Sequence, residues 1–231
     1  MITSRKTNLG EPSEARRVYL TPRKLRRMVG NFCLFFGLST VMSAQDLDNA
    51  PSNVLRHPGW NYGGQISGGS TVVQVSAPTF VTANRSISNF AVVLHSGRVL
   101  TREHGRGWIC GTFEWDVSLI PVENFWVLGS HYTGGFEVFG PRWNFTNGRR
   151  TAVPFVGLSG GMLFSPHNFP PGGTARFNFT AAFDAGTHLF LRPRHSLDVG
   201  MRVQHVSNAY LGRLNPGVPL SLQLTLGYSW Y

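Results

Sequence analysis

The chain has 231 residues, with 21 Lys and Arg against 11 Asp and Glu. Eight of the basic and two of the acidic residues lie within residues 1–44, so the remainder carries 13 and nine, a formal charge of +4 rather than +10. That moderate charge gives no reason to expect nucleic-acid binding. Beyond residue 44 the sequence has one cysteine, Cys110, which excludes an intramolecular disulfide and a multi-cysteine metal site there.

Residues 1–44 have the composition of a secretory signal peptide. Six basic side chains occupy residues 16–27, an uncharged and mostly apolar run covers residues 28–42, and Ser43 and Ala44 are small. The apolar run has 15 residues, fewer than the roughly 20 that a membrane-spanning helix needs. We therefore predict export with cleavage after Ala44 or Ser43, and the alternative is an uncleaved N-terminal anchor. Residues 45–58 are predicted to form a flexible periplasmic lead.

From residue 59 onward, apolar and polar residues alternate with period two, interrupted by Gly, Pro and Asn. Two all-β structures give this pattern. A soluble sandwich places the apolar face in a core, whereas a membrane barrel turns it toward lipid and lines its lumen with the polar face. Strands of ten or more residues favour the barrel. Small and polar residues on the second face, and an amphipathic strand with the aromatic-rich ending Tyr228-Ser229-Trp230-Tyr231, also favour it.

The predicted fold is an all-β, eight-stranded antiparallel transmembrane β-barrel over residues 59–231. The strands are expected near residues 59–72, 87–102, 107–119, 131–145, 150–164, 175–192, 195–209 and 220–231. Residues 167–173 are expected to form a loop. A barrel of eight strands has a lumen filled by side chains, which argues against a diffusion pore.

The strand predicted at residues 195–209 carries the candidate chemistry. Its alternation places His205 and Ser207 on the apolar, lipid-facing side, because residues two apart on a strand point the same way. An imidazole beside a hydroxyl is the minimum for nucleophilic acyl transfer. The alternative is a histidine and a serine at the aqueous rim of a strand. The sequence has no His-x-His or His-Glu-x-x-His spacing, so neither a metal nor another cofactor is expected.

The segment around this pair resembles the signature of the lipid A 3-O-deacylases, also called acyloxyacyl hydrolases. The resemblance is carried by Arg202-Val203-Gln204-His205-Val206-Ser207-Asn208-Ala209 with Asn215-Pro216-Gly217, and more weakly by Gly107-Trp108, Gly135-Phe136 and Leu226-Gly227-Tyr228. It extends over roughly residues 60–231. Members of that family are outer-membrane barrels that remove an ester-linked acyl chain from lipopolysaccharide.

The resemblance implies a role for each matching residue. His205 would be the general base and Ser207 the nucleophile. Asn208, with nearby backbone amides, would stabilise the oxyanion, and Asn215 and Gly217 would lie in the turn that shapes the site.

One position departs from the family pattern. The deacylases place a Glu two residues after the matching Gly to orient the histidine, and this chain has Pro219 there. Loss of an orienting acid can be costly, although the remaining residues retain some rate. Asn215 is a neutral alternative partner for the imidazole, whereas Asp198, Glu114 and Asp184 are predicted to face the lumen.

The sequence therefore leaves two functions open. The first is an esterase of the bacterial outer membrane that acts on lipid A, and the second is a non-catalytic barrel of the same fold with a structural or lipid-binding role. Expected partners are lipopolysaccharide, through its lipid A, and the barrel-assembly machinery. The sequence leaves open whether the barrel forms a homodimer and which acyl chain would be removed.

Overall fold

The computed structural model describes residues 50–73, 86–149, 151–170 and 174–231. The predicted signal peptide and residues 45–49 of the predicted lead lie outside the described residues. The strands are β1 (Gly59–Val73), β2 (Ser88–Val99), β3 (Thr112–Trp126), β4 (Ser130–Phe139), β5 (Pro141–Asn144), β6 (Ala152–Phe169), β7 (Ala175–Arg192), β8 (His195–Ser207) and β9 (Val218–Trp230). Two short 3-10 helices, η2 (Pro51–Arg56) and η3 (Gly107–Ile109), accompany them. No helix in these ranges is long and apolar enough to cross a membrane.

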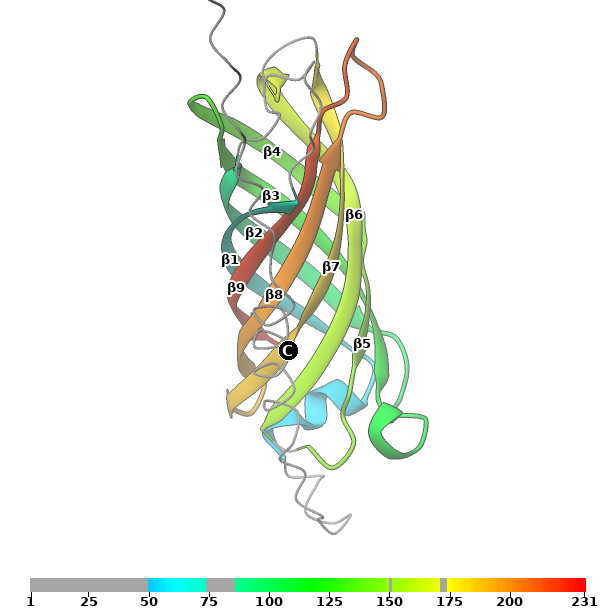
Figure 1. Ribbon diagram of the computed structural model, residues 1–231. Coiled ribbons are helices and arrows are strands. Elements are labelled where there is room, and N and C mark those ends of the chain that lie inside the picture. Colours follow the sequence, from blue (N-terminus) through cyan, green and yellow to red (C-terminus); the bar gives the residue numbers. More distant parts are fainter. Residues whose placement is uncertain (1–49, 74–85, 150, 171–173) are drawn as a thin grey trace, which may run out of the picture. The chain divides into compact units, whose positions relative to one another are not determined.

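The strands form one antiparallel sheet that closes on itself (Figure 1). Strand β1 pairs with β9 on one side and with β2 on the other, and the pairing of β2 with β3 completes the ring. Strands β4 and β5 share one position in the ring, because both pair with β3 and with β6. The nine strand segments of the described residues therefore fill eight positions. The predicted eight-stranded antiparallel barrel is confirmed.

Gly140 explains why β4 and β5 are separate segments. The Asp116 N–H donates to the Gly140 carbonyl at 2.7 Å. A Cβ at Gly140 would lie 2.2 Å from the Asp116 carbonyl oxygen, so only glycine allows the junction of β4 and β5 to approach β3 this closely.

Several predicted boundaries were wrong. Strand β3 begins at Thr112, after η3, and continues to Trp126 instead of ending at residue 119. It passes through Pro121, which lies where the register with β4 shifts, and a proline is tolerated at such a bulge. Strand β6 runs to Phe169, so residues 167–169 of the predicted loop are strand. Phe169 is buried there, with its ring 4.6 Å from that of Phe125.

The described part of the predicted flexible lead, residues 50–58, contains η2. Its Leu55 is fully buried, and the Thr112 hydroxyl donates to the Leu55 carbonyl at 2.8 Å. Arg56 forms an ion pair with Glu103 and donates to the Thr146 carbonyl at 2.7 Å. These contacts fix η2 against the end of the barrel at which β9 ends.

The lumen is filled by side chains. Near the β8–β9 connection it holds the apolar cluster Ile87, Ala91, Val93, Ile120, Phe125, Val127, Leu163, Phe169, Val206 and Val218. At the opposite end it holds Leu55, Val99, Val153 and Phe190, with Val54 and Tyr231 packed against them. A layer of buried polar and charged residues lies between the two clusters. This filled interior fits the expectation that an eight-stranded barrel is not a diffusion pore.

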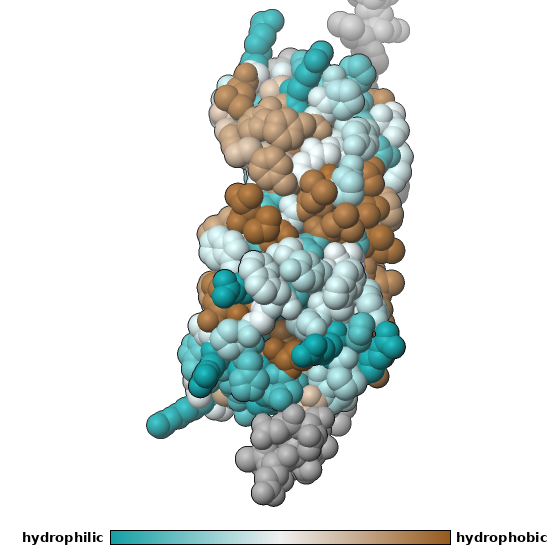
Figure 2. Space-filling model, turned by 180° about the vertical axis from the view of Figure 1, so that it is seen from behind, coloured by the Kyte–Doolittle hydropathy of each residue, from teal (hydrophilic) through white to brown (hydrophobic). Residues whose placement is uncertain are grey.

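The outer wall is largely apolar. Large hydrophobic side chains face outward along the strands; Leu119 and Leu224, for example, are 53% and 70% exposed. Figure 2 shows hydrophobic side chains gathered over the upper and middle part of one face, with hydrophilic ones toward its lower end. An apolar exterior around a polar interior is the reverse of a soluble sandwich and is the arrangement of a membrane barrel.

Candidate active site

His205 and Ser207 lie at the end of β8 and face outward from the barrel. Their neighbours Gln204, Val206 and Asn208 are each at most 2% exposed, whereas His205 is exposed and Ser207 is half-buried. This alternation confirms the predicted parity of the strand. The imidazole and the hydroxyl therefore meet the surroundings of the barrel and not its lumen.

The pairing of β8 with β9 is irregular beside His205. The register shifts between Gln204 and Val206, so His205 lies opposite two residues of β9, Pro219 and Leu220. One residue facing two is the geometry of a β-bulge. A proline is tolerated at a bulge because no ladder hydrogen bond is needed from it.

Gly217 allows β9 to begin this close to β8. Its φ is +59°, in the left-handed region, and a Cβ there would lie 2.4 Å from the Val206 carbonyl oxygen. A residue with a side chain is disfavoured on both counts. The glycine thus brings the first residues of β9 against the segment that carries His205 and Ser207.

Two asparagines brace the connection between β8 and β9. The Asn208 backbone N–H donates to Asn215 Oδ1 at 2.9 Å, and Asn208 Nδ2 donates to the Leu214 carbonyl at 2.8 Å. Asn208 Oδ1 accepts from the Tyr210 backbone N–H at 2.9 Å. Ala209 and Tyr210 both have positive φ, a strained conformation that such bracing helps to maintain. The contacts of both side chains are therefore with the loop.

The His205 imidazole is held by a backbone group. Its Nδ1 lies 2.8 Å from the carbonyl oxygen of Pro219. A carbonyl only accepts, so the bond requires the proton on Nδ1 and leaves the lone pair of the neutral ring on Nε2. In the part of the chain that the structure describes, no hydrogen bond joins this ring to the Ser207 hydroxyl. Catalytic hydrogen bonds often tighten only when substrate is bound.

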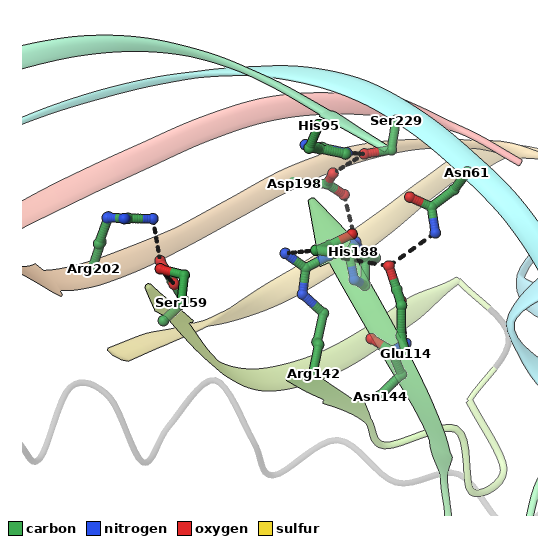
Figure 3. Close-up of polar contacts among 12 residues, drawn as sticks. Asn61, His95, Glu114, Arg142, Asn144, Ser159, His188, Asp198, Arg202 and Ser229 are labelled. Atoms are coloured by element: carbon green, nitrogen blue, oxygen red, sulfur yellow. Dashed lines mark hydrogen bonds and ion pairs between the residues drawn. The ribbon is translucent and has the colours of Figure 1, made fainter. Parts of the chain in front are cut away.

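Among the described strand residues, no carboxylate shares the outer wall with His205. In the described residues, every acidic side chain on a strand points into the lumen: Glu114, Asp116, Glu123, Glu137, Asp184 and Asp198. Figure 3 shows two of these groups, Glu114 and Asp198, with their polar partners around His188 and Arg142. Asp198, for example, accepts from the Ser196 hydroxyl at 2.7 Å and lies 2.7 Å from His188 Nδ1. The predicted lumen orientation of Asp198, Glu114 and Asp184 is confirmed.

A second interior network lies directly behind the candidate site. Gln204 Nε2 donates to Thr180 Oγ1 at 3.1 Å and to Glu123 Oε2 at 3.3 Å. Gln223 of β9 donates to Gln204 Oε1 at 2.6 Å. Sequence reasoning did not identify this support, although a long polar side chain at an inward position next to His205 was a signal for it.

Small side chains adjoin His205 on the outer wall. The residue opposite it on β7 is Ala181, which in turn lies opposite Gly160 of β6. Along β7, Ala181 is flanked on the same face by Phe179 and Phe183, which are 38% and 46% exposed. The space beside the imidazole is thus apolar and bordered by aromatic rings.

The four described ranges contain no cluster of three or more His, Cys, Asp or Glu side chains that could hold a metal ion.

Comparison with known proteins adds a family. The sequence model of the family described as "Lipid A 3-O-deacylase (PagL)" matches residues 98–229, more than half of the chain. No curated protein sequence matches.

Solved barrels with similar folds include three outer-membrane structures. The outer membrane enzyme PagL is 17% identical, covers 74% of this chain and 99% of its own, and has a TM-score of 0.47. Neisserial surface protein A is 12% identical, covers 74% of this chain and 98% of its own, and has a TM-score of 0.45. The N-terminal β-barrel domain of Pseudomonas aeruginosa OprF is 9% identical, covers 75% of this chain and 100% of its own, and has a TM-score of 0.42.

Proposed function

Because the chain belongs to the lipid A 3-O-deacylase family, we propose that it is an esterase that removes an ester-linked acyl chain from lipid A. The chain is a bacterial outer-membrane protein, and its barrel turns an apolar wall toward the lipid. The observation that carries the proposal is the placement of His205 and Ser207 together on that wall, at the end of β8. An acyl chain in the membrane reaches this face without entering the lumen.

The proposed reaction proceeds through an acyl-enzyme. Nε2 of His205 takes the proton of the Ser207 hydroxyl as Oγ attacks the ester carbonyl carbon. Collapse of the tetrahedral intermediate breaks the bond to the sugar oxygen, which leaves as a hydroxyl with the proton from the imidazolium. Nε2 then deprotonates a water molecule, which attacks the acyl-enzyme carbonyl carbon. Collapse of this second tetrahedral intermediate breaks the bond to Ser207 Oγ, which takes the proton back from the imidazolium, and releases the fatty acid.

The supporting residues act through the backbone. Asn208 is buried and bonded within the loop, so we assign it an indirect role on the oxyanion, through the backbone amides that it fixes. Asn215 fixes the Asn208 amide, and Gly217 sets the approach of β9. The acyl chain is proposed to lie beside His205 over Ala181, between the rings of Phe179 and Phe183.

A non-catalytic barrel is the alternative, and Pro219 in place of the family's Glu is the feature that favours it. The test is expression in a Gram-negative host followed by mass spectrometry of its lipid A. Loss of one acyl chain is expected with the natural sequence. With Ser207→Ala or His205→Gln the loss should fall by at least about 10³-fold.

Ser165→Ala is the matched control. This half-buried serine lies on β6, two strand positions from β8, and its hydroxyl donates to the Tyr132 carbonyl at 3.0 Å, so its substitution should leave the loss intact. Folding of each variant is checked by its shift in electrophoretic mobility on heating. Unchanged lipid A with a folded natural barrel, in hosts with different acylation patterns, would contradict the enzyme and support the structural role.

A further inference from the structure

Position 219 is where the proposed site departs from its family. The residue there, Pro219, contacts His205 through its backbone. We infer that the backbone carbonyl of Pro219 replaces the orienting carboxylate and is the positioning group of the general base. The inference rests on the proposed function, because it concerns how His205 is prepared for that reaction.

The geometry meets the requirements of an orienting group. The carbonyl oxygen lies 2.8 Å from Nδ1, the ring nitrogen that an orienting acid contacts in a catalytic triad. It fixes the tautomer with Nδ1 protonated and restrains rotation of the ring. Nε2 is thereby left with the lone pair that a general base needs for the Ser207 proton.

The β-bulge makes this carbonyl available. In a regular antiparallel ladder, carbonyls alternate between bonding the neighbouring strand and facing away from it. Beside His205 two residues of β9 face one of β8, so the ladder is interrupted at Pro219. Proline suits the position, since its ring fixes φ and it has no N–H that would need a partner in the apolar surroundings. Gly217 places the carbonyl by letting β9 approach Val206.

The other candidates for the role are accounted for. Asn215 is engaged with the Asn208 amide, and the strand carboxylates of the described residues face the lumen. The groups that adjoin His205 on the outer wall are Ala181 from β7 with Pro219 and Leu220 from β9, none of which carries a charge.

A neutral partner changes the chemistry in a definite way. A carboxylate stabilises the imidazolium formed during catalysis, whereas a carbonyl only orients the ring. The carbonyl does not titrate, so the site keeps its orienting group at low pH. A carbonyl on the outer wall also avoids the desolvation of a second ionised group.

The first experiment reads the contact without activity. The protein, labelled with ¹⁵N in its histidines, is folded in detergent micelles, and the ring nitrogens are observed by NMR above pH 8. The signal of His205 is identified by its absence in His205→Gln. We expect a neutral ring with the proton on Nδ1, and a proton on Nε2 would overturn the inference. A folded protein with the Nδ1 proton but no deacylation supports the placement and contradicts the proposed function.

The second experiment moves the carbonyl. Gly217→Ala pushes β9 away from Val206 and should mix the two tautomers of His205 while lowering kcat at least about tenfold, with KM within about twofold. Gly148→Ala is the matched control, because Gly148 has a φ of +60° but nothing within 4 Å of an added Cβ. It carries the same backbone strain at the other end of the barrel and should change neither quantity. A folded Gly217→Ala barrel with the natural tautomer and kcat would contradict the inference.

A third variant tests position 219 even where Gly217→Ala fails to fold. Pro219→Glu places a carboxylate beside the imidazole and favours its charged form. The acidic limb of the kcat profile should then move to higher pH by about one unit. A limb that stays in place would show that residue 219 does not face His205.

Discussion

The buried ion pair of Arg202 tests how much the charged groups of the lumen contribute to the stability of the barrel. Arg202 lies on β8 and faces the lumen, as does Gln204, the residue before His205. Its side chain is paired with Glu137 of β4. The two side chains are 8% and 3% exposed, and Arg202 Nη1 also lies 3.5 Å from Asp184 Oδ1. Arg202→Met removes the cation and leaves Glu137 charged in the lumen. Breaking one side of such a pair costs about 3–5 kcal/mol in the free energy of unfolding.

The measurement is a double-mutant cycle. Barrels folded into lipid vesicles are unfolded in urea and followed by tryptophan fluorescence, for the natural protein, Arg202→Met, Glu137→Gln and the double variant. The double variant should recover at least about 2 kcal/mol relative to Arg202→Met, because the stranded charge is gone. Arg213→Met, at an exposed loop arginine, should stay within about 0.5 kcal/mol of the natural protein. Additive single effects would refute the pairing as a source of stability.

Two further predictions concern the outer wall and the loop before β3. Ala181→Phe fills the space beside His205, so the turnover of lipid A should fall at least about tenfold. Hydrolysis of a short-chain chromogenic ester should change less than about threefold. Equal losses on both substrates would contradict the proposed position of the acyl chain. Burial, and then the hydrogen bond to Glu103, raise the pKa of the Cys110 thiol from 9.0 to about 11, so at pH 8 its thiolate is about 100-fold scarcer than at the ordinary pKa. Iodoacetamide labelling of Cys110 should accordingly be slow at pH 8, accelerate toward pH 11, and be faster in Glu103→Gln. Labelling at the rate of free cysteine would argue against the raised pKa of this half-buried thiol.

Alternation in the sequence predicts the barrel wherever it is unbroken. The bounds of β7 were predicted correctly at residues 175–192, since its pattern continues through the whole strand. The end of β3 was missed because it depends on a bulge at Pro121, which only the pairing with β4 reveals. Helix η2 was missed for a similar reason. Its order comes from contacts with Thr112 and Thr146, which are distant in sequence.

The candidate site divides in the same way. Strand parity was enough to place His205 and Ser207 on the outer wall, and the burial pattern confirms it. The partner of His205 was not predictable, because reasoning from side chains treats a proline as the loss of an acid. A backbone acceptor is common to every residue, and only the register of β8 with β9 shows which one meets the ring.

The two faces of the barrel explain why a neutral partner suits this chain. The lumen holds the strand carboxylates of the described residues with the buried arginines, so these acids cannot serve a reaction on the outer wall. A carboxylate placed on the wall would instead be partly desolvated by lipid, at a cost that grows with depth. In Pro219→Glu, stronger stabilisation of the imidazolium is therefore opposed by the cost of desolvating the carboxylate. If His205 lies near the aqueous edge of the membrane, the variant should gain kcat while losing less than about 1 kcal/mol of stability. A larger loss of stability without a gain in kcat would place the site deeper in the lipid, where the carbonyl is the better partner.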